Sequence, residues 1–297
     1  MTDRLLGSGL IIVDKPAGMT SHDVISRLRR IFGTRRVGHA GTLDPMATGV
    51  LVVGIERGTR FLAHLVTETK TYRATIRLGA STTTDDAEGD ITSRTDTTDV
   101  TDTLIDAAIA QLTGDIMQKP AAVSAIKIDG KRAHERVRDG ETVDIPARPV
   151  TVHRFDVLDQ RSVDGYIDLD VDVFCSSGTY IRSLARDLGN ALGVGGHLTA
   201  LRRTTVGPFD LTHARTLEEL EDNPQLSLTL DQALAASFPV LRVSGEEGHK
   251  LAMGQWLEPR GLKEIHAAVT PDGRAVALVK EKGKRLATVF VARPSTL

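Results

Sequence analysis

Two stretches of alternating apolar and polar residues constrain the fold of this chain more than any other feature. Residues 70–78 read KTYRATIRL and residues 166–174 read YIDLDVDVF. Side chains along a strand point to opposite faces in turn, so a period of two predicts strands with one buried face and one polar face. Both stretches are therefore predicted to be half-buried strands. In the first, the core-facing set is predicted to be Tyr72, Ala74, Ile76 and Leu78.

Other segments show helical spacing, so the sequence combines both classes of secondary structure. Residues 24–32 and residues 101–115 carry apolar side chains at helical intervals, and Ser or Thr residues at the start of each can act as N-caps. A third helix is predicted to begin near Thr179 and to end at Gly193. The pattern predicts an α+β protein.

One carboxylate, Asp44, lies in the glycine-rich segment GHAGTLDPMATGVL, which runs from Gly38 to Leu51. Pro45 holds the residues before it away from helical angles, and the glycines permit backbone conformations that other residues avoid. We therefore predict a constrained loop that is neither helix nor strand. A lone acid on such a loop suits a nucleophile or general base, although an Asp–Pro pair is also an ordinary turn, which local composition alone favours.

Charge and cysteine content limit the class of protein. The 297 residues carry a formal net charge of −2, but basic residues cluster at 27–36, 127–138 and 202–203, while residues 85–106 are acidic. Local patches such as these, and not the net charge, decide phosphate binding. The single cysteine cannot form an internal disulfide, and no cysteine–histidine cluster indicates a metal. Without a signal-peptide pattern or a membrane-spanning apolar run, the protein is expected to be cytoplasmic.

The segment from Gly38 to Leu51 resembles the catalytic motif of the TruB-type pseudouridine synthases. Further motifs of that family occur in order along the chain as DKPAGMTS, KTYRATIRLG, CSSGTYIRSLARDLG and LRRTTVGPF, so the resemblance covers most of residues 8–210. It implies an isomerase that flips uridine 55 out of the T-arm stem-loop of tRNA and converts it to pseudouridine. Such an enzyme is expected to need no cofactor and no metal.

The resemblance also implies a domain organisation. Residues 1–237 are expected to form a pseudouridine-synthase catalytic domain of α+β class, with a mixed, largely antiparallel sheet flanked by helices. Residues 118–150 resemble the substrate-gripping insertion called the thumb, although Ala121 and His134 stand where the family commonly has proline and tyrosine. Residues 238–297 contain short strands divided by glycine turns, and are expected to form a small PUA-like β-barrel that binds RNA.

The family's site residues can be carried over motif by motif. Asp44 is implied to be catalytic, Tyr72 to stack on the flipped uracil, and Tyr180 to pack in the uracil pocket. Arg182 is implied to pair with Asp44, because a carboxylate enclosed by aromatic rings would otherwise rise in pKa and protonate. Leu201 is implied to lie against the base. The other residues predicted to bind substrate are His39 and Lys15, and Lys15 with Pro16 is also implied to support the catalytic loop.

Basic and acidic stretches are expected to shape the RNA-binding face. Arg202 and Arg203 are predicted phosphate contacts, and the basic residues of the thumb, 131–138, are predicted to bind the RNA backbone. The arginines of residues 27–36 suit a solvated helix face or a phosphate-contacting surface about equally. The acidic, polar residues 81–101 are predicted to be an exposed loop away from that face.

Each motif also has a plainer interpretation. Tyr72 could be a core residue with a satisfied hydroxyl, and Arg182 could form a surface salt bridge. A protein that binds or folds tRNA without catalysis could share the scaffold, but it would be expected to lack Asp44 or Arg182. Guide-RNA-dependent synthases share the motifs, yet the thumb-like insertion and the absence of lysine-rich tails favour a stand-alone enzyme. We expect a monomer, although no motif in the chain determines the oligomeric state. Whether Asp44 attacks the base, attacks the sugar or removes a ribose proton stays open.

Overall fold

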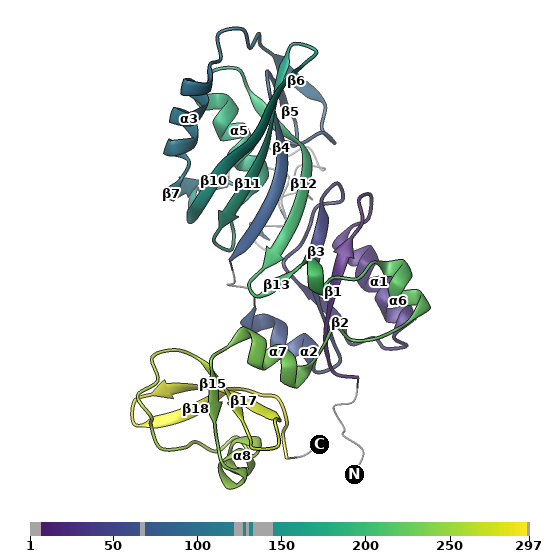
Figure 1. Ribbon diagram of the computed structural model, residues 1–297, viewed down its shortest axis with the longest axis vertical. Coiled ribbons are helices and arrows are strands. Elements are labelled where there is room, and N and C mark those ends of the chain that lie inside the picture. The colour runs from purple at the N-terminus through teal and green to yellow at the C-terminus, as the bar shows by residue number, and fades with distance from the viewer. Residues whose placement is uncertain (1–6, 66–68, 122–126, 129–130, 133–144, 296–297) are drawn as a thin grey trace. The chain divides into compact units, whose positions relative to one another are not determined.

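The computed structural model describes residues 7–65, 69–121, 127–128, 131–132 and 145–295 (Figure 1). The chain divides into two compact units. We call residues 1–66 and 205–297 the terminal unit, and residues 67–204 the central unit. The predicted domain boundary at residue 238 falls inside the terminal unit, and it stays a prediction.

A buried antiparallel sheet organises the first part of the terminal unit. Its strands run in the order β14–β1–β3, and β2 pairs with the other edge of β3. The residues from Leu10 to Val13 are fully buried, which explains why β1 is a continuous apolar run without alternation. The strands are β1 (Gly9–Lys15), β2 (Val37–Ala40), β3 (Thr48–Ile55), β13 (Phe209–Asp210) and β14 (Leu228–Thr229).

Most helices of the terminal unit begin at side-chain caps, whereas α2 and η1 do not. The predicted N-cap of the first helix is confirmed as Thr20, whose hydroxyl accepts from the Asp23 amide while the Asp23 carboxylate accepts from the Thr20 amide. On its exposed side, Arg27 binds Glu218 and Glu221 of α6. The helices are α1 (Ser21–Ile31), α2 (Gly58–Phe61), η1 (Leu62–His64), η2 (Leu211–His213), α6 (Leu217–Asp222) and α7 (Leu230–Ser237).

The C-terminal part of the terminal unit is a four-stranded sheet in the order β15–β16–β17–β18. Its first pair of strands is parallel, and the other two pairs are antiparallel. The prediction of short strands in this region is confirmed. Residues 245–252, which were not predicted as helix, form α8 behind a capping box of Ser244 and Glu247. The elements are β15 (Val240–Arg242), α8 (Gly245–Ala252), β16 (His266–Val269), β17 (Ala275–Lys282) and β18 (Arg285–Val291).

This C-terminal sheet shares its core with the rest of the terminal unit. The rings of Phe290 and Phe61 lie 6.1 Å apart between centroids. At the start of α7, the Asp231 carboxylate accepts from the Ala275 amide at 2.8 Å and pairs with Arg293 at 2.6 Å. A charged pair that is mostly buried and also holds a backbone amide fixes the sheet in one position on α7.

The central unit is an antiparallel sheet covered on one side by helices α3 and α5 (Figure 1). Its strands run in the order β12–β4–β11–β10–β7. The helix predicted over residues 101–115 is confirmed with Thr101 as its N-cap, but it ends at Gln111, and residues 114–115 belong to β7. The main elements are β4 (Lys70–Leu78), α3 (Asp102–Gln111), β7 (Gly114–Gln118), β10 (Arg148–Val163), β11 (Tyr166–Cys175), α5 (Ile181–Ala191) and β12 (Gly196–Val206).

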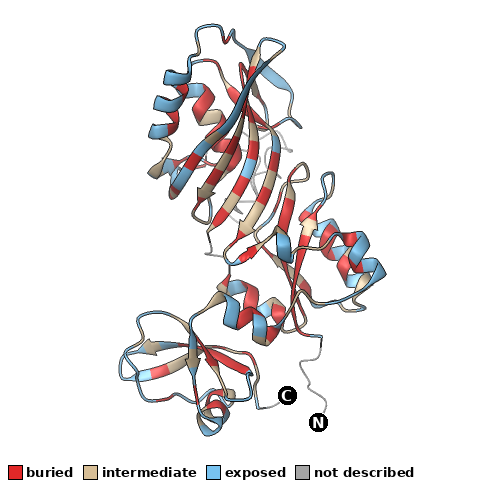
Figure 2. Ribbon diagram, in the orientation of Figure 1, coloured by how far each residue is buried: buried red, intermediate tan, exposed pale blue. Residues whose placement is uncertain are grey.

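The two alternating stretches form neighbouring strands of this sheet, as their pattern predicts. In β4 every second residue from Lys70 to Leu78 is buried, and Figure 2 shows the alternation as bands along the strand. β11 pairs with β4 so that Val173 lies opposite Tyr72 and Leu169 opposite Ile76. Cross-strand neighbours share a face, so the apolar residues of both strands meet under the helices.

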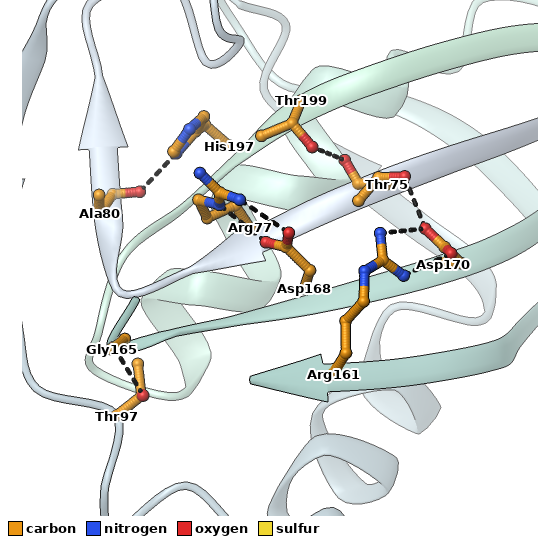
Figure 3. A network of polar contacts seen from close by, with 10 residues as sticks. All are labelled: Thr75, Arg77, Ala80, Thr97, Arg161, Gly165, Asp168, Asp170, His197 and Thr199. Carbon is orange, nitrogen blue, oxygen red and sulfur yellow. Dashed lines mark hydrogen bonds and ion pairs between the residues drawn. The ribbon is translucent and has the colours of Figure 1, made fainter. Parts of the chain in front are cut away.

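The aspartates on the polar face of β11 are neutralised by arginines. Figure 3 shows Arg77 beside Asp168, with two contacts of 2.7 Å, and Arg161 beside Asp170. Hydrogen bonds from Arg161 and Thr75 lower the pKa of Asp170. These ion pairs connect adjacent strands, so the repeated aspartates stabilise the sheet.

Most of the predicted thumb lies outside the described residues, including His134 and the basic residues beyond 132. Two short strands of it are described, β8 (Lys127–Ile128) and β9 (Lys131–Arg132), and they pair antiparallel with Lys127 opposite Arg132. Among the helices of the described residues, none has the length and apolar character needed to cross a membrane.

Candidate active site

Asp44 lies half-buried in a short loop of the terminal unit. The loop covers residues 41–47 only, because β2 ends at Ala40 and β3 begins at Thr48. The prediction that the whole segment avoids regular structure was therefore wrong at both ends, where pairing with β3 and β1 outweighs the glycine content. Gly41 and Gly49 do adopt left-handed backbone angles, with φ of 79° and 99°.

The backbone just before Asp44 is held by one buried hydroxyl. Ser21 Oγ donates to the Leu43 carbonyl at 3.0 Å and accepts from the Leu43 amide at 2.9 Å. Both residues are buried, so these backbone groups have little access to water. The first residue of α1 thus fixes the position of the loop 22 residues further along the chain.

The backbone just after Asp44 is held by a buried ammonium group. Lys15 Nζ donates to the carbonyls of Pro16, Met19 and Pro45 at 2.8, 2.5 and 3.2 Å. The Gly18 amide also donates to the Pro45 carbonyl, at 2.8 Å. Lys15 is fully buried, so the structure supports its predicted role in holding the loop, while contact with substrate stays a prediction.

His39 lies next to this loop on β2, half-buried and opposite Val53 of β3. Its predicted contact with substrate is not tested by these backbone pairings. Its place two residues before Gly41 puts it at the edge where the loop that carries Asp44 leaves the sheet.

Tyr72 belongs to the central unit and is 7% exposed, on the apolar face of β4. This confirms that it points with the core-facing residues. It lies at the start of that face, opposite Val173 of β11. An aromatic ring at the end of an apolar face can serve as a platform for stacking.

Tyr180 is the N-cap residue of α5, and a buried amide fixes its backbone. Gln118 Oε1 accepts from the Tyr180 amide at 2.8 Å, and Gln118 Nε2 donates to the Tyr180 carbonyl at 3.1 Å. Gln118 is 1% exposed and comes from the last residue of β7. Sequence reasoning missed this residue, since no local pattern marks a glutamine that acts on a helix 62 residues away.

Arg182 follows in the first turn of α5 and is 5% exposed. Its Nη1 donates to the Thr84 carbonyl at 3.0 Å and lies 3.5 Å from Asp86 Oδ2. Asp86 is itself buried, and its other oxygen accepts from Thr84 Oγ1 at 2.6 Å and from the Glu88 amide at 3.0 Å. The guanidinium therefore belongs to a buried polar cluster, and a simple surface salt bridge is excluded.

The acidic stretch next to this cluster is structured and partly buried, contrary to expectation. The stretch 81–101 was predicted to be an exposed loop, but β5 (Ala80–Thr82) and β6 (Ile91–Arg94) pair within it. Asp85 binds Arg186 of α5 at 3.1 Å, and burial raises the pKa of its carboxyl. The acids turn inward because two arginines of α5 face them, so this loop lies against the predicted site residue Arg182.

Two further expectations concern the end of the central unit. Leu201 on β12 is 8% exposed, in keeping with a residue that contacts apolar groups. Arg203 is 1% exposed, so its predicted contact with a phosphate was wrong, whereas Arg202 is half-buried. Within the described residues, no three His, Cys, Asp or Glu side chains are grouped to hold a metal ion.

The predicted site residues thus fall into two sets. Lys15, His39 and Asp44 belong to the terminal unit, where buried polar groups hold the loop on both sides of Asp44. The central unit contains the other four, Tyr72, Tyr180, Arg182 and Leu201. The predicted ion pair between Asp44 and Arg182 stays a prediction.

Comparisons with known families cover nearly the whole chain. Residues 29–181 match the family described as "TruB family pseudouridylate synthase (N terminal domain)". Residues 182–236 match "tRNA pseudouridylate synthase B C-terminal domain", and residues 238–293 match "tRNA Pseudouridine synthase II, C terminal". The last match begins at the predicted domain boundary.

Curated relatives are similar over their full length. The chain is 73% identical over 297 residues to "tRNA pseudouridine synthase B" of Corynebacterium efficiens, covering 100% of both chains. It is 59% identical over 289 residues to the protein of the same name from Nocardia farcinica, covering 97% of this chain and 94% of that protein.

Among solved structures, a "Cbf5-Nop10-Gar1 Complex" contains a chain of similar fold, with a TM-score of 0.73 and 27% identity. The similarity covers 98% of this chain and 87% of that one. An "H/ACA RNP bound to a substrate RNA containing 2'-deoxyuridine" gives a TM-score of 0.72 and 26% identity, over 96% of this chain and 85% of that one.

Proposed function

The chain belongs to the TruB family of pseudouridylate synthases, and we propose that it isomerises uridine 55 in the T arm of tRNA to pseudouridine, with Asp44 as the catalytic residue. The observation that carries the proposal is the fixed backbone around Asp44. Ser21 holds Leu43, and Lys15 with Gly18 holds Pro45. A catalytic group must be kept close to its productive geometry, and buried hydrogen bonds on both sides provide that.

The reaction is an isomerisation and needs no net exchange of electrons. The bond between the ribose and nitrogen 1 of uracil breaks, the base turns, and a bond forms from the ribose to carbon 5. The proton on carbon 5 leaves and nitrogen 1 gains one, so the atoms balance. A carboxylate can serve as nucleophile or as base in such a sequence, and Asp44 is the residue proposed for that step.

We propose that Arg182 keeps Asp44 ionised in a water-poor site. An isolated carboxylate enclosed by aromatic rings would rise in pKa, and a nearby guanidinium opposes that rise. The support for this role is that Arg182 is itself held in place by the Thr84 carbonyl and Asp86. A guanidinium fixed by a carbonyl and a carboxylate presents its remaining edge in one orientation.

The flipped uracil is proposed to bind between side chains of the central unit. Tyr72 would stack on the base, with Tyr180 and Leu201 completing an apolar pocket. Aromatic platforms accept any base, so stacking holds the uracil without selecting it. His39 and Lys15 are proposed to act at the loop that carries Asp44, Lys15 chiefly as its support.

Recognition of the tRNA is proposed to use the thumb, residues 118–150, and a PUA-like C-terminal module, residues 238–297, that closes to a small barrel. The full-length similarity to proteins named tRNA pseudouridine synthase B supports tRNA as the substrate. The enzyme is proposed to act alone, as a cytoplasmic monomer without a guide RNA. Similarity to the chains of the two solved complexes is weaker, at 26–27% identity.

The test uses a T-arm stem-loop transcript as the only RNA, with uridine carrying tritium at carbon 5. The protein is expected to release label to water from the uridine at position 55 without metal, nucleotide or guide RNA. A matched transcript with cytidine at that position reports release from all other uridines. Equal release from both transcripts would contradict the proposed target, and no release from either would contradict the proposed activity.

A further inference from the structure

An exposed aromatic side chain lies on the C-terminal sheet at a place that the proposed chemistry does not use. Trp256 is the single tryptophan of the chain and is 46% exposed. The guanidinium carbon of Arg285 lies 4.8 Å from the centroid of its ring, in cation–π contact. The ring is therefore oriented but remains open to solvent.

Backbone pairing places Trp256 at the edge of the β17–β18 hairpin. Leu257 and Leu286 exchange two backbone hydrogen bonds, of 3.0 and 2.8 Å, and form an isolated antiparallel bridge beside β18. Leu257 and Leu286 are buried in the core of the C-terminal sheet. Neighbouring residues on a strand point to opposite faces, so Trp256 points outward with Arg285.

The same outward face carries lysines of β17. Lys280 lies opposite Ala287, and Lys282 lies opposite Arg285. Cross-strand partners share a face, so Lys280, Lys282, Arg285 and Trp256 form one surface, which we call the Trp256 face. All four side chains are exposed, and none of the three cations makes an ion pair with another residue of the described chain.

Acidic residues close by do not cancel this charge. Glu281 lies on the opposite face of the hairpin, where its Oε1 accepts from the amides of Arg260, Gly261 and Leu262 at 2.6, 2.9 and 3.2 Å. These hydrogen bonds lower the pKa of Glu281 and hold its charge away from the lysines. Among the described residues, Glu258 is the one acid that the pairing places on the Trp256 face, against three cations.

We propose that the Trp256 face binds an unpaired nucleotide of the substrate RNA, which stacks on the indole while the cations contact its phosphates. The chemistry fits, because every base has a flat π-face that stacks on an aromatic ring, and a cationic surface beside the ring attracts the backbone. Lys280 and Lys282 are about 7 Å apart along the strand, which lets them meet different phosphates of an extended chain. The inference rests on the proposed function, since that function makes RNA the partner.

The single tryptophan allows a direct test in the full-length protein. An unstructured oligoadenylate of about eight nucleotides is titrated while tryptophan emission is recorded, because a base stacked on the indole quenches it. Quenching is expected with the oligoadenylate and not with a blunt RNA duplex of equal length. Unchanged emission with the oligoadenylate, or equal quenching by the duplex, would overturn the proposal.

Variants separate stacking from charge. Trp256→Ala is expected to weaken binding of a labelled oligoadenylate about tenfold or more, and Trp256→Tyr to restore most of it. Lys280→Ala is expected to flatten the log–log salt dependence by roughly 0.7. The control Lys250→Ala removes an exposed lysine that is already paired with Glu246 at 3.1 Å, and should leave the slope nearly unchanged.

Other outcomes would exclude the site. Full affinity in Trp256→Ala, or an equal change of slope in Lys250→Ala and Lys280→Ala, would show that RNA binds elsewhere. A wild-type dimer that Trp256→Ala converts to a monomer would make this face a contact between copies of the chain. Pseudouridine formation without quenching would contradict this inference and leave the proposed function intact. Quenching without pseudouridine formation would contradict the proposed function and leave RNA binding at the Trp256 face intact.

Discussion

Replacing Ser21 by alanine tests how the loop that carries Asp44 is held. The substitution removes the hydroxyl that bonds to both the amide and the carbonyl of Leu43, at 2.9 and 3.0 Å. Each buried backbone group left without a partner costs about 1–3 kcal/mol. Because the two costs are not fully additive, we expect the free energy of unfolding to fall by about 2–4 kcal/mol.

The loss is expected to reach the reaction rate as well as stability. Leu43 directly precedes Asp44, and a displacement of a catalytic group by about 1 Å costs roughly 100-fold in rate. The measurements are urea unfolding and the single-turnover rate at saturating T-arm RNA. Affinity for the RNA is expected to change little, because Ser21 is buried and cannot touch it.

Ser26→Ala provides the matched control on the same helix. Ser26 Oγ donates to the His22 carbonyl at 3.0 Å and is exposed, so its removal should change the free energy of unfolding by less than about 0.5 kcal/mol. The reasoning is refuted if Ser21→Ala is as stable as Ser26→Ala. A destabilised Ser21→Ala protein with an unchanged rate would refute the positioning of Asp44 by this hydroxyl.

Three further predictions concern the core, the thiol and the platform tyrosine. Phe290→Ala should lower the free energy of unfolding by about 3–5 kcal/mol in urea titrations, because Phe290 packs against Phe61. Truncation after Phe238 should also destabilise the protein, and a truncated chain as stable as the full chain would contradict the shared core. Burial raises the pKa of the Cys175 thiol from 9.0 to about 11, so a thiol reagent at pH 8 should react fast with the unfolded protein and not with the native protein. Because the unfolded state loses this proton at a lower pH, the free energy of unfolding should fall between pH 9 and 11, and Cys175→Ala should remove this part of the loss. Tyr72→Phe keeps the stacking surface, so it should bind T-arm RNA normally and turn over slowly if the hydroxyl assists proton transfer, whereas an equal rate would leave Tyr72 as a platform only.

Local patterns in the sequence predicted the elements that depend on local physics. The alternation in β4 and β11 and the cap at Thr101 are properties of neighbouring residues, and the structure confirms them. The capping box of Ser244 and Glu247 was equally visible, but short strands were predicted across it because glycines surround a helix of eight residues. Here turn composition was given too much weight over a helix-start signal.

Contacts between distant residues could not be predicted from the chain alone. Ser21 acts on Leu43, Gln118 on Tyr180, and Arg182 on Thr84, at separations of 22, 62 and 98 residues. Burial of Arg203 is likewise a result of tertiary packing that charge clustering cannot show. Acidic composition predicted a solvated loop, whereas the structure turns those acids toward arginines of α5.

The central claim is that Asp44 reacts in a uridine-55 synthase, and tritium release from carbon 5 measures it most directly. Asp44→Asn keeps nearly the same shape but is a far weaker nucleophile and base. It is expected to bind the T-arm stem-loop as the wild type does and to release label at least roughly 10⁴-fold more slowly, about 5 kcal/mol of barrier. Release by Asp44→Asn at the wild-type rate, with wild-type affinity for the same RNA, would contradict the account.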